Sequence, residues 1–254
     1  MKKIFIDEEI RVFENENAVN KLTQINDSKF YNEIEKGVHK VDKERWVSAQ
    51  KYEKKTWMSN LMIRDDRNYE HLDRFEKLSS VVGMFDNPKV IELGCGPFTN
   101  VRLMTDILNP SEITLLDPLI NEYVNHPNCY YKNYSLNQVP VKIVNSPIES
   151  FTTEEKYDIV IMINVIEHCY DVNLIFDVIQ NILKNGGIFI FSDVYFEEIK
   201  ERLQNTYDAG HPIRMSKEKI DSFISKFKNI FEKRYNGLYN QDWRNDLYFI
   251  GIKE

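Results

Sequence analysis

The sequence predicts an α/β fold organised around a mostly parallel sheet, and three observations indicate it. From residue 88 onward, short apolar runs alternate with stretches whose apolar residues recur at helical spacing. A Gly-x-Gly turn, Gly94-Cys95-Gly96, directly follows the first apolar run, and an acidic residue, Asp117, directly follows the second. Because the carboxyl ends of parallel strands meet at one edge of a sheet, this pattern also predicts a ligand site there.

Composition and charge limit the possible classes of protein. The chain has 254 residues, 42% of them hydrophobic, with only nine Gly and eight Pro, so it can build a substantial core. Its net charge of −7 argues against a broad nucleic-acid-binding surface. Cys95, Cys129 and Cys169 are too scattered for a disulfide framework and form no Cys-x-x-Cys zinc motif. The apolar stretch at 1–6 is too short for a signal peptide, and no run is long enough to cross a membrane. We expect a cytoplasmic monomer or homodimer that binds neither nucleic acid nor membrane.

The region before the first core strand is long and mostly helical in pattern. Residues 1–14 are spaced for an extended arm, and 16–36 and 43–62 carry apolar residues at helical spacing. Residues 65–83 predict another helix, with acidic residues at its start and Gly83 at its end. We therefore expect two units.

Residues 1–64 are expected to form an N-terminal helical cap or arm, and residues 65–254 the main domain. Trp46, Tyr52 and Trp57 lie near one face of the predicted cap helix. These aromatic side chains either pack the cap onto the domain or line a substrate pocket.

The first predicted strand runs into the glycine turn and then into a helix at 99–108. Glycine there lets the backbone approach a ligand and tolerates a positive φ, and the helix that follows presents free N–H groups. A Gly-x-Gly turn with a downstream acid is found in dinucleotide dehydrogenases and in class I S-adenosylmethionine (SAM) methyltransferases. The dehydrogenase pattern requires a third glycine where this chain has Thr99. The stretch Val90–Pro97 instead closely resembles the first motif of the methyltransferases.

Further elements follow in alternating order. Residues 112–116 predict the second strand, part of 119–135 a helix, and 141–145 the third strand. The run at 157–163 is apolar enough for a strand buried on both faces. Its exit, Asn164–His168, resembles the fourth motif of small-molecule methyltransferases.

The last third of the chain completes the pattern. Asp171 is expected to cap a helix that ends near Gly186, and residues 183–193 resemble the helix–Gly-Gly–fifth-strand passage of the same family. Ser216 is expected to cap a helix extending to Ile230, followed by strands at 231–235 and 247–252. The resemblance covers about residues 66–254. It implies a seven-stranded, mostly parallel sheet with helices on both faces and a terminal antiparallel hairpin.

The resemblance also implies where SAM binds. Glu92, Gly94, Cys95 and Gly96 would approach its methionyl part, and Asp117 would accept both ribose hydroxyls. The adenine would lie between Ser146, Pro147 and Ile148, and the sulfonium beside Asn164 and Val165. The product would be S-adenosylhomocysteine (SAH), and we expect no metal because no ligand cluster is visible along the chain.

The acceptor side is less defined by sequence. His211 follows the fifth strand in a loop that overlies the acceptor pocket in this fold, so it is the candidate base, with His168 as a second choice. Tyr31, Trp46, Tyr52 and Trp57 are candidate pocket residues, and Arg214 could orient an acidic acceptor.

The leading hypothesis is a SAM-dependent methyltransferase acting on a small molecule. We expect the acceptor to be an oxygen of a sugar, sugar nucleotide or secondary metabolite. Two alternatives remain open at this point, an NAD-dependent oxidoreductase of Rossmann type and a non-catalytic SAM-binding subunit.

Overall fold

The computed structural model describes most of the predicted domain and part of the region before it. The described residues are 37–59, 78, 83, 85–196, 209–236 and 245–254, together with the backbone of 3–6 and 9–12. The predicted helices at 16–36 and 65–83 therefore lie outside the described residues, apart from positions 78 and 83, and so does Tyr31.

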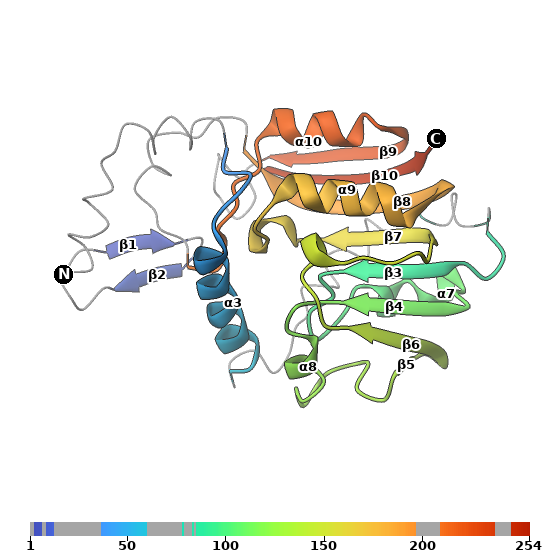
Figure 1. Cartoon of the computed structure of the whole chain (residues 1–254), viewed down its shortest axis with the longest axis horizontal. Helices are drawn as coiled ribbons and strands as arrows, with labels where there is room; N and C mark the ends of the chain where they lie inside the picture. Colours follow the sequence, from blue (N-terminus) through green and yellow to red (C-terminus); the bar gives the residue numbers. More distant parts are fainter. Residues whose placement is uncertain are drawn as a thin grey trace.

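The centre of the molecule is an eight-stranded sheet of order β5-β6-β4-β3-β7-β8-β10-β9 (Figure 1). Its five central neighbours from β6 to β8 are parallel, whereas β10 runs antiparallel to β8 and to β9. The predicted seven-stranded sheet with a terminal hairpin is confirmed, and the short β5 adds an antiparallel edge strand that the sequence did not predict. The strands are β3 (Lys89–Leu93), β4 (Glu112–Leu116), β5 (Ser135–Leu136), β6 (Val139–Val144), β7 (Tyr157–Ile163), β8 (Leu183–Tyr195), β9 (Phe227–Asn236) and β10 (Asn245–Lys253).

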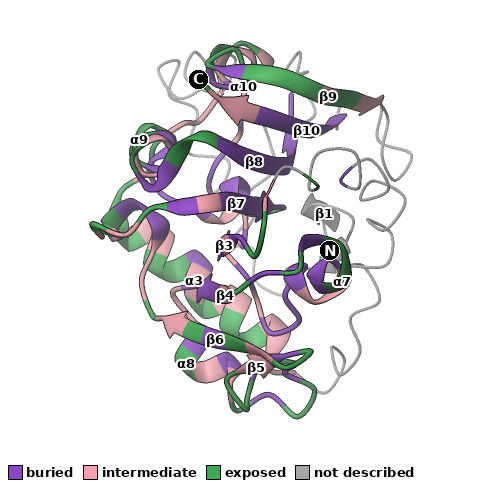
Figure 2. Ribbon diagram, turned by 90° about the vertical axis from the view of Figure 1, so that its right-hand side faces the viewer, coloured by how far each residue is buried: buried purple, intermediate pink, exposed green. Residues whose placement is uncertain are grey.

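Helices cover both faces of this sheet (Figure 2). Alternate residues of each strand point to opposite faces, so Leu93 and Val90 of β3 belong to different apolar clusters. One cluster packs against α9 (Val172–Ile182) and α10 (Lys217–Ile224). The other packs against the short elements η3 (Val101–Leu103), α7 (Thr105–Leu108) and α8 (Ile120–Tyr123).

Two helix starts follow the predicted capping. Asp171 accepts the backbone N–H groups of Asn173 and Leu174 at the start of α9, and Ser216 accepts that of Lys219 at the start of α10. The other boundary predictions need correction. Helix α9 ends at Ile182, before Gly186, because the chain turns directly into β8.

The helices predicted at 99–108 and within 119–135 are much shorter than expected. The first is split into the 3₁₀ turn η3 and the single turn α7, and the second is only the four-residue α8. Residues 227–230, expected to end a helix, instead begin β9. Apolar spacing alone did not show these changes, because both a short helix and an edge strand can bury such residues.

Before the domain, the strands expected in the N-terminal arm form an antiparallel pair, β1 (Lys3–Ile6) and β2 (Glu9–Val12). The predicted cap helix is present as α3 (Lys43–Trp57), and the Asp42 carboxylate caps it by accepting the N–H of Arg45 at 2.7 Å. Helix α3 lies across the carboxyl ends of the parallel strands (Figure 1). Among the described residues, no helix is both long and apolar enough to cross a membrane.

Candidate active site

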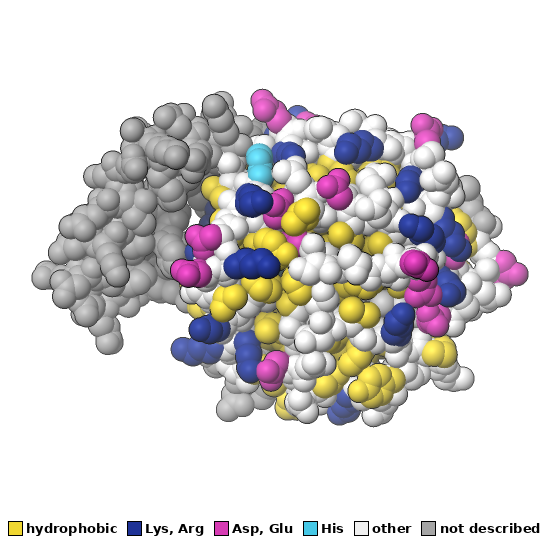
Figure 3. Space-filling model, in the orientation of Figure 1, with side chains coloured by type: hydrophobic (Ala, Val, Ile, Leu, Met, Phe, Trp, Pro, Cys, Tyr) yellow, Lys and Arg dark blue, Asp and Glu magenta, His cyan; other side chains and the backbone are white. Residues whose placement is uncertain are grey.

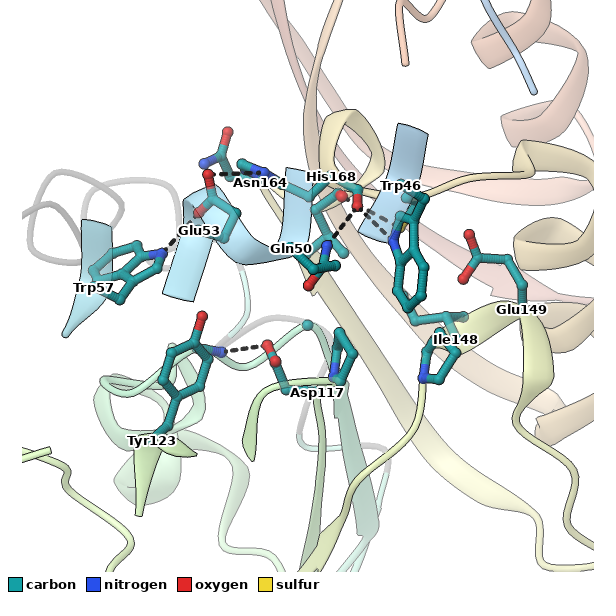
Figure 4. A pocket seen from close by; sticks show the side chains of 16 residues that line it. Trp46, Gln50, Glu53, Trp57, Asp117, Tyr123, Ile148, Glu149, Asn164 and His168 are labelled. Carbon is teal, nitrogen blue, oxygen red and sulfur yellow. Dashed lines mark hydrogen bonds and ion pairs between the residues drawn. The ribbon is translucent and has the colours of Figure 1, made fainter. Parts of the chain in front are cut away.

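A cavity lies between α3 and the carboxyl edge of the sheet (Figure 4). Its walls come from α3 and from the loops that follow four parallel strands, which is the edge at which open α/β sheets bind ligands. The lining residues are Trp46, Gln50, Glu53, Trp57, Gly94, Gly96, Asp117, Pro118, Tyr123, Pro147, Ile148, Glu149, Asn164, Val165, His168 and Cys169.

The two glycines after β3 serve different purposes. A Cβ on Gly94 would lie 2.5 Å from a methyl carbon of Val165, so this glycine lets the ends of β3 and β7 touch. A Cβ on Gly96 would meet no atom of the residues that the structure describes within 4 Å, although its φ of +54° disfavours any other residue. Gly96 therefore leaves open space beside the cavity. Cys95 between them faces the core, where its thiol lies 3.8 Å from the Tyr131 hydroxyl.

Asp117 lies at the end of β4 and faces the same cavity. Its Oδ2 accepts the N–H of Gly96 at 3.1 Å, and its Oδ1 accepts that of Leu119 at 2.8 Å. The residue is 8% exposed, and burial raises the pKa of its carboxyl to about 6. The carboxylate is thus oriented toward the glycine turn before any ligand arrives.

Glu92 does not line the cavity, in contrast to the sequence-based expectation. It is fully buried, and its carboxylate accepts the Thr99 hydroxyl and the backbone N–H groups of Asn100 and Val101. These bonds anchor the loop after the glycine turn and satisfy N–H groups that the first turn of a helix leaves without an intrahelical partner. Glu92 therefore positions the turn rather than contacting a ligand.

Two further buried carboxylates anchor the neighbouring loops in the same way. The Asp193 Oδ2 accepts the N–H groups of Val165 and Ile166 at 2.9 and 2.8 Å, and burial raises the pKa of this carboxyl to about 7. Glu149 accepts the N–H groups of Tyr170 and Asp171 at 2.6 and 3.2 Å. The loop after β7 is consequently held at its start, by the bonds to Asp193, and at its end, by the bonds to Glu149.

At the end of β7, Asn164 has a φ of +56° and contributes to the cavity wall. Such a backbone conformation is uncommon outside glycine and is tolerated best by Asn. Val165 also lines the cavity, so the two residues expected beside the sulfonium both lie in its wall. On the opposite wall, Pro147 and Ile148 line the cavity, whereas the Ser146 hydroxyl donates to the Pro147 carbonyl oxygen and does not contribute to the lining.

Helix α3 supplies four lining residues: Trp46, Gln50, Glu53 and Trp57. Two were predicted and two, Gln50 and Glu53, were missed, although the four positions share the helical spacing that places them on one face. Trp46 Nε1 and Gln50 Nε2 both donate to the His168 carbonyl oxygen, at 3.1 and 3.0 Å. Helix α3 is therefore attached to the loop after β7. Tyr52, which was also predicted, does not line the cavity.

The side chains of His168 and His211 are in contact. The spacing of residues along strands and helices could not have predicted this contact. Their ring centroids are 4.4 Å apart, and His168 Nδ1 lies 3.6 Å from Glu53 Oε1. His168 lines the cavity and His211 packs behind it. Arg214 was expected to face an acceptor, but its Nη1 donates to the His211 carbonyl oxygen at 2.9 Å and lies 3.6 Å from Glu167 Oε1. Arg214 thus holds the His211 loop.

Comparisons with known proteins agree with this geometry. Residues 63–234, more than half of the chain, match the sequence profile of a family described as "Methyltransferase domain". No curated protein matches the sequence significantly.

Solved structures match the fold at low sequence identity. The N-methyltransferase NodS from Bradyrhizobium japonicum WM9, in complex with SAH, is 13% identical over 83% of this chain and 99% of its own, with a TM-score of 0.58. A coclaurine N-methyltransferase bound to N-methylheliamine and SAH is 11% identical over 92% and 94%, with a TM-score of 0.56. A chain titled StiE O-MT is 12% identical over 76% of each chain, with a TM-score of 0.53.

The glycine turn, the acid after β4 and the strand order define a class I methyltransferase fold with a SAM site. The family match then identifies the chain: it belongs to the methyltransferase-domain family and is a SAM-dependent methyltransferase. The alternative of an NAD-dependent oxidoreductase is therefore wrong.

Proposed function

We propose that the protein transfers a methyl group from SAM to an oxygen of a small polar acceptor, such as a sugar, sugar nucleotide or secondary metabolite. The observation that supports this proposal is that one continuous cavity contains both kinds of residue. It joins the glycine turn and Asp117 on one side to the polar side chains Gln50, Glu53 and His168 on the other. A donor site and a polar acceptor site are thereby in direct contact.

The residues around the glycine turn fit SAM. The missing Cβ of Gly96 leaves room at the turn, and the Asp117 carboxylate lies within hydrogen-bond distance of that turn. A carboxylate with two acceptor oxygens is suited to the two hydroxyls of a ribose. Pro147 and Ile148 offer the apolar wall that an adenine ring requires.

The chemistry follows from this arrangement. When bound, SAM supplies a methyl carbon on a positively charged sulfur, so the methyl group needs no further activation. The chain must hold an acceptor atom in line with that carbon and keep water out. Trp46 and Trp57 exclude water from two sides, while Gln50 and Glu53 offer hydrogen-bonding groups that orient a hydroxyl.

A small acceptor is supported by the coverage of α3. The helix closes one side of the cavity and is fixed by its bonds to the His168 carbonyl oxygen, so within the part of the chain that the structure describes the cavity is covered by α3. On the face seen in Figure 3, basic and acidic side chains are interspersed rather than gathered into a basic stripe. Three of the solved structures that share the fold are titled N-methyltransferases, and two of these titles name a bound small molecule besides SAH, 1,6-didemethyltoxoflavin or N-methylheliamine.

Two measurements test the proposal. Isothermal titration calorimetry with SAH is expected to show one site per chain, and absence of binding would contradict the donor assignment. A radioactive methyl-transfer assay on panels of hydroxylated and aminated small molecules then identifies the acceptor atom. Turnover of amines alone would replace the oxygen acceptor by nitrogen and leave the donor assignment intact.

A further inference from the structure

Three potential metal ligands from distant parts of the chain meet beside the cavity. They are Glu53 on α3, His168 on η5 (Ile166–His168) and His211 in the loop before α10. One ligand atom from each residue lies within 4.8 Å of the other two. The side chains of Glu53 and His168 are only 12% and 21% exposed, so the group is sheltered from solvent but open to the cavity.

The three residues are held in place by neighbours. Trp57 Nε1 donates to Glu53 Oε2 at 3.0 Å, which leaves Oε1 directed at His168 (Figure 4). The backbone of His168 is fixed by the bonds from α3, and its Nδ1 lies 3.2 Å from the Gly210 carbonyl oxygen. A contact of this kind, in which the Nδ1–H of a histidine donates to a backbone carbonyl, typically orients a histidine that binds a metal through Nε2.

We propose that Glu53, His168 and His211 bind a divalent transition-metal ion. Two imidazoles and one carboxylate form a donor set that suits zinc, iron(II), manganese(II) or cobalt(II) better than magnesium or calcium, which favour sets made only of oxygen. Ligand atoms around such an ion lie about 3.0–3.5 Å apart at metal–ligand distances of ~2.1 Å. The candidate ligand atoms of the three residues lie within 4.8 Å of one another, so binding an ion would draw them closer to reach that spacing.

A site with three protein ligands keeps coordination positions open for oxygen atoms of water or of a substrate. Because Glu53 and His168 also line the cavity, these positions face the place where an acceptor must bind. The inference rests on the proposed function and narrows its substrate class. The acceptor would carry two neighbouring oxygen atoms that can chelate the ion, as in a vicinal diol, a catechol or an α-hydroxy acid.

With a metal ion bound, the acceptor hydroxyl would lose its proton without a histidine base. An acceptor hydroxyl bound to a divalent ion has a lowered pKa and releases its proton to water. Its oxygen then forms the bond to the methyl carbon, and the electron pair of the breaking carbon–sulfur bond stays on the sulfur, leaving a neutral thioether. The alternative for the same cluster is a metal-free relay in which His211 accepts the proton, as the sequence suggested. Metal titration separates the two.

The first experiment uses the full-length protein after treatment with EDTA and removal of the chelator. Titration with CoCl2 is expected to show one equivalent bound per chain and visible absorption bands, and ZnCl2 is expected to displace the cobalt. His211→Ala and Glu53→Gln should each weaken cobalt binding by more than 100-fold. Glu44→Gln serves as the matched control, because Glu44 is exposed on the same helix.

A second variant tests the supporting contact. Trp57→Phe keeps an aromatic ring but removes the N–H that holds Glu53, and it should weaken cobalt binding about 10-fold. If none of CoCl2, ZnCl2 or MnCl2 binds, or if binding is unchanged in His211→Ala and Glu53→Gln, the metal site is refuted and the relay remains.

SAH binding to the metal-free protein distinguishes failure of the metal site from failure of the proposed methyltransferase function. His211→Ala should bind SAH within about threefold of the unmodified protein, because His211 does not line the cavity. Normal SAH binding without metal binding would refute the metal site alone, whereas loss of SAH binding in the unmodified protein would refute the proposed function.

Discussion

The two sides of the cavity are built in different ways. On the donor side, the loops after β3 and β7 are held by the buried carboxylates of Glu92 and Asp193, which accept backbone N–H groups. On the acceptor side, α3 is held by side chains that donate to one carbonyl oxygen, that of His168. The buried carboxylates lie inside the core, whereas the bonds from α3 join this helix to the loop after β7 at the surface of the core.

This difference has an energetic consequence. A buried carboxylate that satisfies two N–H groups cannot be removed without leaving those donors unpaired, which costs about 1–3 kcal/mol for each group. A partly exposed helix contact is replaced by water at a net cost of about 1 kcal/mol. Changes on the donor side should therefore weaken SAH binding strongly, whereas changes on the acceptor side should mainly alter the motion of α3 and the rate of methyl transfer.

The largest effect is expected for Gly96→Val. The substitution places a branched side chain at a φ of +54° and fills the open space beside the turn. Calorimetry should show SAH affinity reduced by more than 100-fold. Gly83→Val is the control, because a Cβ there also meets no atom of the described residues within 4 Å and its φ is not in the left-handed region. Equal SAH binding by the two variants would show that the turn is not the donor site.

Asp117→Asn should have the next largest effect. The amide keeps the size of the side chain but replaces one acceptor oxygen by a donor, so a ribose loses a charge-assisted bond. A loss of about 1.5–3 kcal/mol, or roughly 10- to 150-fold in SAH affinity, is expected. Asp106→Asn, an exposed position on α7, should leave the affinity unchanged. An unaffected Asp117→Asn protein would remove the ribose assignment.

The pH dependence of SAH binding should reveal the same carboxyl group. Ribose hydroxyls favour the ionised form of Asp117, whose pKa is raised to about 6 in the free protein. SAH affinity should thus fall up to tenfold per pH unit below about pH 6, and this slope should vanish in Asp117→Asn. The sign for stability is opposite. Because the pKa rises from 3.8 on folding, ionisation of Asp117 lowers the stability of the free protein as pH increases from about 4 to 6.

The smallest effect is expected on the acceptor side. Gln50→Leu removes one of the two bonds from α3 to the His168 carbonyl oxygen, a contact of about 1 kcal/mol. Hydrogen exchange of the α3 amides should accelerate about fivefold, with little change in SAH affinity. Lys51→Met, at an exposed position on the same helix, is the control. A 100-fold loss of SAH affinity in Gln50→Leu would show that the two sides are not separable.

The sequence was informative where function depends on neighbouring residues. The strand, the glycine turn and the acid after β4 are each local, so the sequence could place Gly94, Gly96 and Asp117 together at the carboxyl edge, where they line the cavity. The role of Glu92 could not be predicted, because it depends on which N–H groups fold over its carboxylate. Nor could the group of Glu53, His168 and His211, because tertiary packing alone joins a cap helix to two distant loops. The assignment of residues 1–64 as a separate cap stays a prediction.

The position of α3 also determines how long a ligand stays bound. The cavity beneath the helix measures about 100 Å³, whereas sites for drug-sized ligands usually exceed ~300 Å³. We therefore expect the helix to move outward when a nucleoside-sized molecule enters and to return afterwards. Departure of the product requires the same movement, and such steps limit turnover in many enzymes. Trp46 and Gln50 would then set the residence time of SAH, although neither takes part in bond making.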